Sequence, residues 1–173
     1  MSGILPLIDV VIANEEDCHD VLGIQAGATD VQAGALDTSR YPDVARQVVQ
    51  QFPNVSKVAI TLRESLSATH NNWGAMLYDA ASDQPSFAPL DAEGDYQPHE
   101  IRNIVDRVGG GDAFAGGLIF ALTTPALDDP QTALNYAVAA SCLKHSIKGD
   151  VNFSTRGEVE SLMGGSASGR VVR

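Results

Sequence analysis

The sequence VDRVGGGDAFAGGL, residues 105–118, decides the fold of this chain. Gly109, Gly110 and Gly111 precede Asp112, which opens a segment with the apolar pattern of a helix. Glycine permits backbone turns that other residues avoid, and a helix N-terminus presents free N–H groups and the positive end of its dipole. Together these features predict an anion-binding site, and phosphate is the usual ligand of such sites.

Asp112 adds chemistry to that site. A carboxylate beside a phosphate repels it, unless the carboxylate removes a proton from an attacking hydroxyl. Asp112 is therefore a candidate general base. The alternative is a glycine-rich helix start in which Asp112 is the N-cap residue.

Composition narrows the class of protein. The 173 residues are enough for one domain with a hydrophobic core, and 44% of them are apolar, as in soluble globular proteins. The net charge of −11 argues against binding nucleic acid or an anionic membrane surface. We see neither a membrane-spanning apolar run nor a signal peptide at the start, so we expect a cytoplasmic protein.

Apolar, β-branched runs predict buried strands at 9–13 and 57–62. Further strands are predicted at 72–79 and 86–89, as a hairpin, and at 101–105. Helices are predicted over 14–22, 41–52, 112–122, 130–145 and 154–162, a loop over 23–34 and a flexible tail over 164–173. The first strand begins so early that we expect other strands to precede it in the complete protein.

Strands that alternate with helices indicate an α/β fold with a largely parallel sheet. Ligands bind such sheets beyond the carboxyl ends of the strands. Three candidate segments are expected at strand ends, namely 14–17, 61–65 and 109–112. The cysteines, Cys18 and Cys142, have no metal-type spacing and are expected as buried free thiols in helices.

Residues 106–114, DRVGGGDAF, resemble the C-terminal signature of the ribokinase-like (PfkB) carbohydrate kinases, usually Asp-Thr-x-Gly-Ala-Gly-Asp-x-Phe. Residues 14–17, NEED, resemble the family's Asn-x-x-Glu, with Asp17 in place of the final Glu. Residues 61–63, TLR, resemble its Thr-Leu-Gly, with Arg63 in place of Gly. The wording of these segments is most similar to the 2-keto-3-deoxygluconate kinases, and the resemblance covers only the C-terminal half of the family.

The resemblance implies a three-layer α/β/α fold over residues 1–163. It also implies ATP-dependent phosphorylation of a sugar or sugar acid hydroxyl, with 2-keto-3-deoxygluconate converted to its 6-phosphate. Asp112 would be the general base, and Gly109–Gly111 would form the anion hole. The implied partners are a sugar acid and ATP, with a homo-oligomer in the complete protein.

The resemblance also implies where cofactors bind. Asn14 and Asp17 would orient Mg²⁺, largely through water. Asp106 and Val108, with the loop at 146–152, would hold a monovalent cation such as K⁺ through carbonyl oxygens. The residues implied in nucleotide binding are Asn14, Thr61, Arg63, Ser65, Val138 and Gly149.

Two other functions remain open. The chain could be a truncated, catalytically incompetent remnant that binds nucleotide or a partner, because the half that would carry the first strands, the lid and most sugar contacts lies outside the resemblance. We therefore expect the chain alone to be a poor kinase with an exposed sheet edge. Dinucleotide binding is weaker, because Phe114 stands where the G-x-G-x-x-G pattern needs its third glycine.

Overall fold

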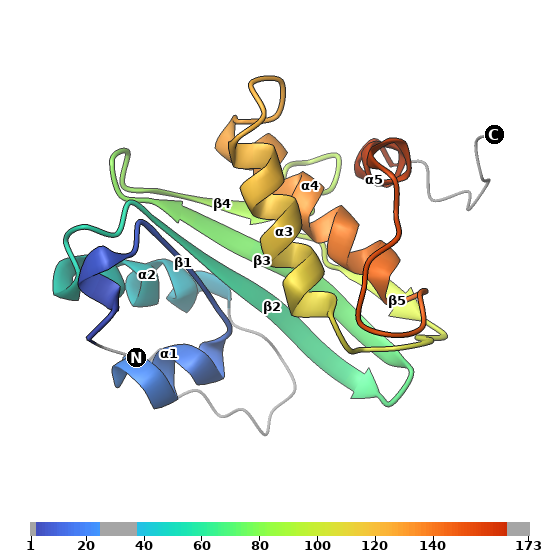
Figure 1. Ribbon diagram of the computed structural model, residues 1–173, viewed down its shortest axis with the longest axis horizontal. Helices are drawn as coiled ribbons and strands as arrows, with labels where there is room; N and C mark the ends of the chain where they lie inside the picture. The colour runs from blue at the N-terminus through green and yellow to red at the C-terminus, as the bar shows by residue number, and fades with distance from the viewer. Residues whose placement is uncertain (1–2, 25–37, 166–173) are drawn as a thin grey trace.

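The computed structural model describes residues 3–24 and 38–165 of the chain (Figure 1). Most of the predicted 23–34 loop and of the 164–173 tail therefore lies outside the described residues. Five strands form one sheet: β1 (Val10–Ala13), β2 (Lys57–Ser67), β3 (His70–Asp79), β4 (Gln84–Ala88) and β5 (His99–Arg102). The helices are α1 (Glu15–Leu22), α2 (Tyr41–Gln51), α3 (Gly110–Leu122), α4 (Pro130–Lys144) and α5 (Arg156–Met163), with short 3₁₀ turns at Leu5–Leu7 and Thr38–Arg40.

The structure has the three α/β/α layers that the resemblance implies. The helices α1 and α2 pack on one face of the sheet, and α3, α4 and α5 pack on the other (Figure 1). Alternation along β2 explains both cores: Val58 and Ile60 face α2, whereas Ala59 faces α4. Because both faces are covered there, β1 and the first half of β2 are nearly continuous apolar runs rather than alternating ones. The α/β fold class and its three layers are confirmed.

The strand directions differ from the expected largely parallel sheet. The sheet order is β1-β2-β3-β4, with β5 also on β3, and only β1 and β2 run parallel. The other three pairs are antiparallel. The reason is the length of the connections: β2–β3 and β3–β4 are joined by tight turns, which force antiparallel pairing, whereas β1 reaches β2 through two helices.

Two predicted boundaries were wrong for local reasons. The last short strand ends at Arg102 rather than residue 105, because Asn103 takes a left-handed φ of 57°. Helix α3 begins at Gly110, two residues earlier than predicted, with Gly109 as its N-cap residue. Asp112 is therefore inside the first turn, and the alternative in which it caps the helix is wrong.

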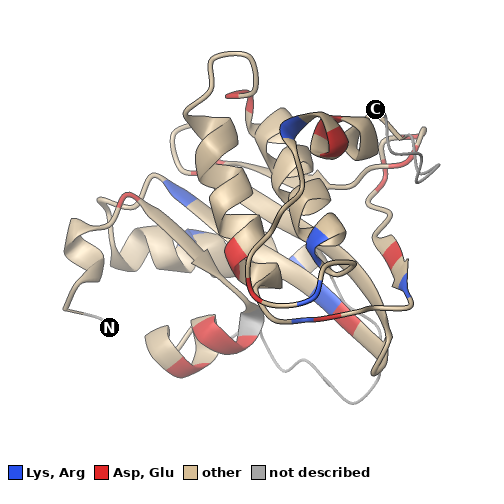
Figure 2. Cartoon of the chain, turned by 45° about the vertical axis from the view of Figure 1, so that its right-hand side comes forward, with Lys and Arg blue, Asp and Glu red and all other residues tan. Residues whose placement is uncertain are grey.

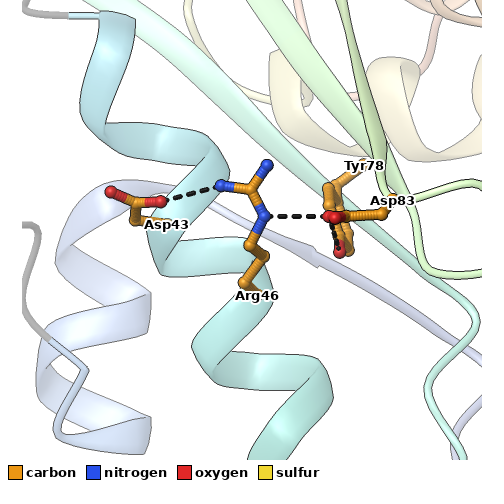
Figure 3. Close-up of polar contacts among 4 residues, drawn as sticks. All are labelled: Asp43, Arg46, Tyr78 and Asp83. Atoms are coloured by element: carbon orange, nitrogen blue, oxygen red, sulfur yellow. Dashed lines mark hydrogen bonds and ion pairs between the residues drawn. The ribbon is translucent and has the colours of Figure 1, made fainter.

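Side chains close the fold on the α2 side (Figure 3). Arg46 of α2 donates to Asp43 on its own helix and to Asp83 in the β3–β4 turn, both at 2.8 Å. The Tyr78 hydroxyl also donates to Asp83, at 2.7 Å. The Arg46 and Tyr78 bonds lower the pKa of the Asp83 carboxyl. This network ties α2 to the turn at one end of the sheet.

Several smaller predictions concern buried side chains. Trp73 and Tyr78 are buried and pack in the two cores, one on each face of the sheet. Cys18 on α1 is a buried free thiol, and Cys142 on α4 is a half-buried one. No helix within residues 3–24 and 38–165 is long and apolar enough to cross a membrane.

Candidate active site

The glycine loop before α3 is held in a conformation that needs glycine at its last turn. Gly109 has a φ of 76°, in the left-handed region, and a Cβ placed there would lie 2.0 Å from the carbonyl oxygen of Asp150. The loop thus touches the α4–α5 connection, forty residues later in the chain. No residue other than glycine fits without moving that connection.

Asp106 joins the same two segments. Its carboxylate accepts the N–H of Val108 at 3.0 Å and the N–H of Gly149 at 2.8 Å. These bonds, that of Val108 first, lower the pKa of Asp106, so the carboxylate is ionised at neutral pH. Asp106 and Gly149, two predicted cofactor residues, are thereby brought together by a contact within the chain itself.

Arg107 anchors the loop to the sheet. Its guanidinium donates to the Oδ1 of the fully buried Asn71 at 2.8 Å and also to the carbonyl oxygen of Ser67. These acceptors lie at the β2–β3 turn and at the start of β3. The arginine that replaces the family's usual threonine therefore has a structural partner within the chain.

Helix α4 supports the loop from behind. The buried Ser141 hydroxyl donates to the carbonyl oxygen of Gly110 at 2.8 Å, and the carbonyl oxygen of His145 accepts the N–H of Val105 at 2.9 Å. The His145 ring lies against Gly110 and packs edge-on to Trp73, with 5.2 Å between ring centroids. Burial lowers the pKa of His145, so its ring is neutral and adds no charge behind the loop.

The first turn of α3 keeps free donors on its other side. The N–H of Ala113 is taken by Gly109 O at 2.9 Å, and that of Gly110 makes only a long contact of 3.4 Å to Arg107 O. The N–H groups of Gly111 and Asp112 have no acceptor in the described part of the chain. Basic side chains are few and scattered among acidic ones (Figure 2), so the free backbone N–H groups are the main groups here that could hold an anion.

Asp112 lies at the third position of α3, is exposed, and lines a pocket of about 580 Å³. Three segments far apart in sequence form this pocket: α3, α4 and the loop that leads into α5. The lining residues are Asp112, Ala113, Gly116, Gly117, Phe120, Tyr136, Ala140, Asp150, Val151, Asn152, Ser154 and Val159. Helices α3 and α4 approach closely at Gly117, where a Cβ would lie 3.1 Å from the Ala137 Cα.

Most of the other predicted site residues lie outside this pocket. Val138 is 1% exposed and packs in the core, whereas Tyr136 and Ala140 on the same helix line the pocket. Sequence reasoning missed Phe120 and Tyr136, since nothing in the local pattern marks them. Asp150 lies in the loop at 146–152, which the resemblance implied in holding a monovalent cation but not in lining this pocket.

Residues 61–65 lie within β2, not beyond its end, because the strand continues to Ser67 in pairing with β3. Thr61, Arg63 and Ser65 share the face of Ala59, which is the face covered by α3 and α4. Arg63 is exposed and pairs across the ladder with Trp73. Its charge lies close enough to His145 to contribute, after burial, to the lowered pKa of that ring.

Asn14 and Asp17 form a capping box at the start of α1. The Asn14 side chain accepts the N–H of Asp17 at 2.8 Å, and Asp17 accepts the N–H of Asn14 at 3.0 Å. Capping is thus a role that the geometry displays directly. Across the described ranges, no three His, Cys, Asp or Glu side chains gather as a metal site.

Comparison with known proteins identifies the fold. The crystal structure of the 2-dehydro-3-deoxygluconokinase from Thermotoga maritima matches with a TM-score of 0.76 and 40% identity, over 95% of this chain and 44% of that one. A PfkB family carbohydrate kinase from Listeria grayi matches with a TM-score of 0.71 and 25% identity, over 94% of this chain and 43% of that one. The structural neighbours of this chain are PfkB-family carbohydrate kinases.

The chain is also similar in sequence to a curated sugar acid kinase. The 2-dehydro-3-deoxygalactonokinase of Haloferax volcanii is 27% identical over 168 residues, which are 97% of this chain and 42% of that protein. No family model matches the chain. The resemblance to PfkB kinases drawn from the sequence is confirmed, and the chain spans less than half the length of these relatives.

Proposed function

We propose that this chain is the nucleotide-side part of a PfkB kinase that transfers a phosphoryl group from ATP to a hydroxyl of a sugar acid. The observation that carries the proposal is the start of α3, where free N–H groups of Gly111 and Asp112 stand beside an exposed carboxylate that lines a pocket. The names of the Thermotoga and Haloferax relatives support a 2-dehydro-3-deoxy sugar acid as substrate. We propose 2-keto-3-deoxygluconate as the substrate and its 6-phosphate as the product.

In this proposal Asp112 accepts the proton of the attacking hydroxyl. The hydroxyl oxygen bonds to the γ-phosphorus, the bond from that phosphorus to the bridging oxygen breaks, and ADP leaves with the bond's electron pair. The N–H groups at Gly109–Gly111 and the helix dipole stabilise the negative charge on the transferring group. The His145 ring behind the loop is neutral and adds no charge of its own to the site.

The pocket suits the rest of the nucleotide. Phe120 and Tyr136 lie with ring centroids 5.4 Å apart, and the Arg156 guanidinium lies 5.8 Å from the Phe120 centroid. Such surfaces bind a flat, apolar base. We propose that these residues contact the base, in place of Val138, which the resemblance implies in nucleotide binding. Thr61, Arg63 and Ser65 are proposed on the phosphate side, where Arg63 can pair with phosphate oxygens.

The cofactor proposals depend on which side-chain oxygens of Asn14, Asp17 and Asp106 can still contact a cation or its water. In the capping box the Asp17 Oδ2 and the Asn14 Oδ1 each accept one N–H, and Asp17 is exposed. Oxygens of this kind fit Mg²⁺ held through water, and Mg²⁺ would neutralise phosphate charge. The Asp106 carboxylate is engaged by N–H donors, so a K⁺ site at Asp106 and Val108 would have to use backbone carbonyl oxygens.

A coupled ATP-consumption assay with 2-keto-3-deoxygluconate tests the proposal. We expect the chain alone to turn over poorly, and the chain joined to the N-terminal part of the Thermotoga relative to turn over sugar acid. In that joined form, Asp112→Asn should lower kcat about 10²–10⁴-fold while ADP affinity stays the same. Turnover within threefold of the parent would remove Asp112 as the base.

A second candidate is a nucleotide-binding module without turnover. The chain covers 42–44% of the length of these relatives. This second candidate predicts ADP binding by the chain but no sugar-dependent ATP consumption in any joined form. Light scattering belongs in the same experiment, because β1 pairs only with β2 among the described strands and leaves an open edge. A cytoplasmic location and a homo-oligomeric complete protein also remain proposals.

A further inference from the structure

Ser141 of α4 makes a buried contact that the proposed chemistry does not itself use. Its hydroxyl donates to the carbonyl oxygen of Gly110 at 2.8 Å, and the side chain is 0% exposed. A carbonyl oxygen has two lone pairs, so this bond is compatible with the helical bond that the same oxygen accepts. The contact crosses between two helices, from the middle of the core to the first residue of α3.

The geometry of the peptide unit gives this contact a consequence. The peptide between Gly110 and Gly111 is planar and trans, so its C=O and its N–H point in opposite directions. Because the Ser141 bond helps to fix the orientation of this peptide plane, it also helps to fix the direction of the Gly111 N–H, which is opposite to that of the C=O. That N–H is one of the two free donors at the start of α3.

Glycine makes such support necessary. Gly109, Gly110 and Gly111 have no side chains to restrict their backbone, and a Cβ at Gly111 would meet nothing within 4 Å. The His145 ring also restrains Gly110, since a Cβ there would lie 3.3 Å from its Cε1. His145 Nδ1 donates in turn to the carbonyl oxygen of Ser141 at 2.8 Å.

We infer that Ser141 is a positioning residue, which aims the N–H of Gly111 at the phosphoryl group through its bond to Gly110. The inference rests on the proposed function, because it assumes that the start of α3 binds phosphate. Ser141 touches neither substrate nor cofactor in this account. It acts through one peptide plane.

The experiment uses the 173-residue chain labelled with ¹⁵N. Residual dipolar couplings report the direction of the Gly111 N–H without any ligand, and a titration with inorganic phosphate at constant ionic strength reports binding at the Gly111 and Asp112 amides. Ser141→Ala should change the Gly111 coupling and weaken phosphate binding about three- to tenfold, the usual effect of one hydrogen bond.

Thr123→Ala is the matched control. Thr123 also donates its hydroxyl to a backbone carbonyl, that of Ile119 at 2.8 Å, but at the far end of α3. This variant should leave both the Gly111 coupling and the phosphate titration unchanged. If both variants lose stability but only Ser141→Ala changes the Gly111 coupling and the phosphate titration, those changes come from positioning and not from a general loss of stability.

The outcomes separate the two proposals. If Ser141→Ala leaves the Gly111 coupling unchanged, the positioning role is wrong whether or not phosphate binds. If the coupling changes but phosphate affinity does not, the contact is structural only and the inference is again wrong. If phosphate shifts no amide of the loop in the unaltered chain, the anion site of the proposed function fails, and its positioning residue with it.

Discussion

Helices α1 and α3 both carry an aspartate at their third position, yet the two residues do different things. Asp17 of α1 turns back to accept the N–H of Asn14, whose side chain in turn accepts the N–H of Asp17. Asp112 of α3 forms no such pair within the described residues: its carboxylate accepts no N–H from Gly109, and Gly109 has no side chain to accept the N–H of Asp112. The first helix start is closed by its own residues, and the second is open.

The two helix starts differ in which groups of the first turn are engaged. In a capping box the N-cap side chain accepts a first-turn N–H, and the third-position carboxylate accepts the backbone N–H of the N-cap residue. Gly109 has no side chain to accept an N–H, and no hydrogen bond engages the Asp112 carboxylate within the described residues. An anion site and a general base can then share one helical turn.

The largest effect should come from replacing the residue that keeps α3 open. Gly109→Ala places a Cβ in the left-handed region and 2.0 Å from Asp150 O, so we expect a loss of about 2–3 kcal/mol in the free energy of unfolding. The loop should also stop binding phosphate. Chemical denaturation and the phosphate titration measure the two effects.

Gly111→Ala is the control for that change. No heavy atom lies within 4 Å of its added Cβ, and alanine favours a helix. Its stability should equal or exceed that of the unaltered chain. Equal losses at Gly109 and Gly111 would show that the contact with Asp150 is unimportant.

A smaller effect should come from opening α1. Asn14→Ala removes the cap and should cost about 1 kcal/mol of stability. Asn14→Ser keeps a capping oxygen and should restore most of it. We expect the NMR signal of the Gly111 amide to stay unchanged in Asn14→Ala, because the two helix starts are independent in the absence of nucleotide. A shift of that signal would contradict this independence.

The smallest effect is a pH dependence at the loop before α3. The pKa of Asp106 is lowered in the folded chain, so its stabilising contribution is present above its ordinary pKa of 3.8 and is lost as the pH falls through the lower, folded value. Asp106→Asn should therefore be less stable than the unaltered chain at pH 6. Denaturation curves at pH 6 and pH 3 should show the gap shrinking in acid, and a constant gap would contradict the bonds to Val108 and Gly149.

Local sequence signals predicted the helices, both apolar strands and the glycine loop, because each rests on residues close together in the chain. They misplaced the 61–65 segment, since the polar residues after Leu62 are held in β2 by pairing with β3. They also did not show which residues of α4 line the pocket. Helix α4 is largely buried and apolar on several sides, so its pattern does not show that Tyr136, rather than Val138, faces the pocket.

The pocket itself was beyond sequence reasoning for a related reason. Phe120, Tyr136 and Asp150 meet only because α3, α4 and the following loop pack together. The capping box, by contrast, lies within four residues and was visible, although its pattern is equally compatible with the magnesium role implied by the resemblance.

The bonds around Gly109 and Gly110 have a consequence for entropy. A glycine-rich loop loses more conformational freedom than any other segment when it is ordered. Here Asp106, Ser141 and His145 order the loop while the chain folds. Under the proposed function, a phosphate would meet donors already in place, so little ordering entropy would be subtracted from its affinity.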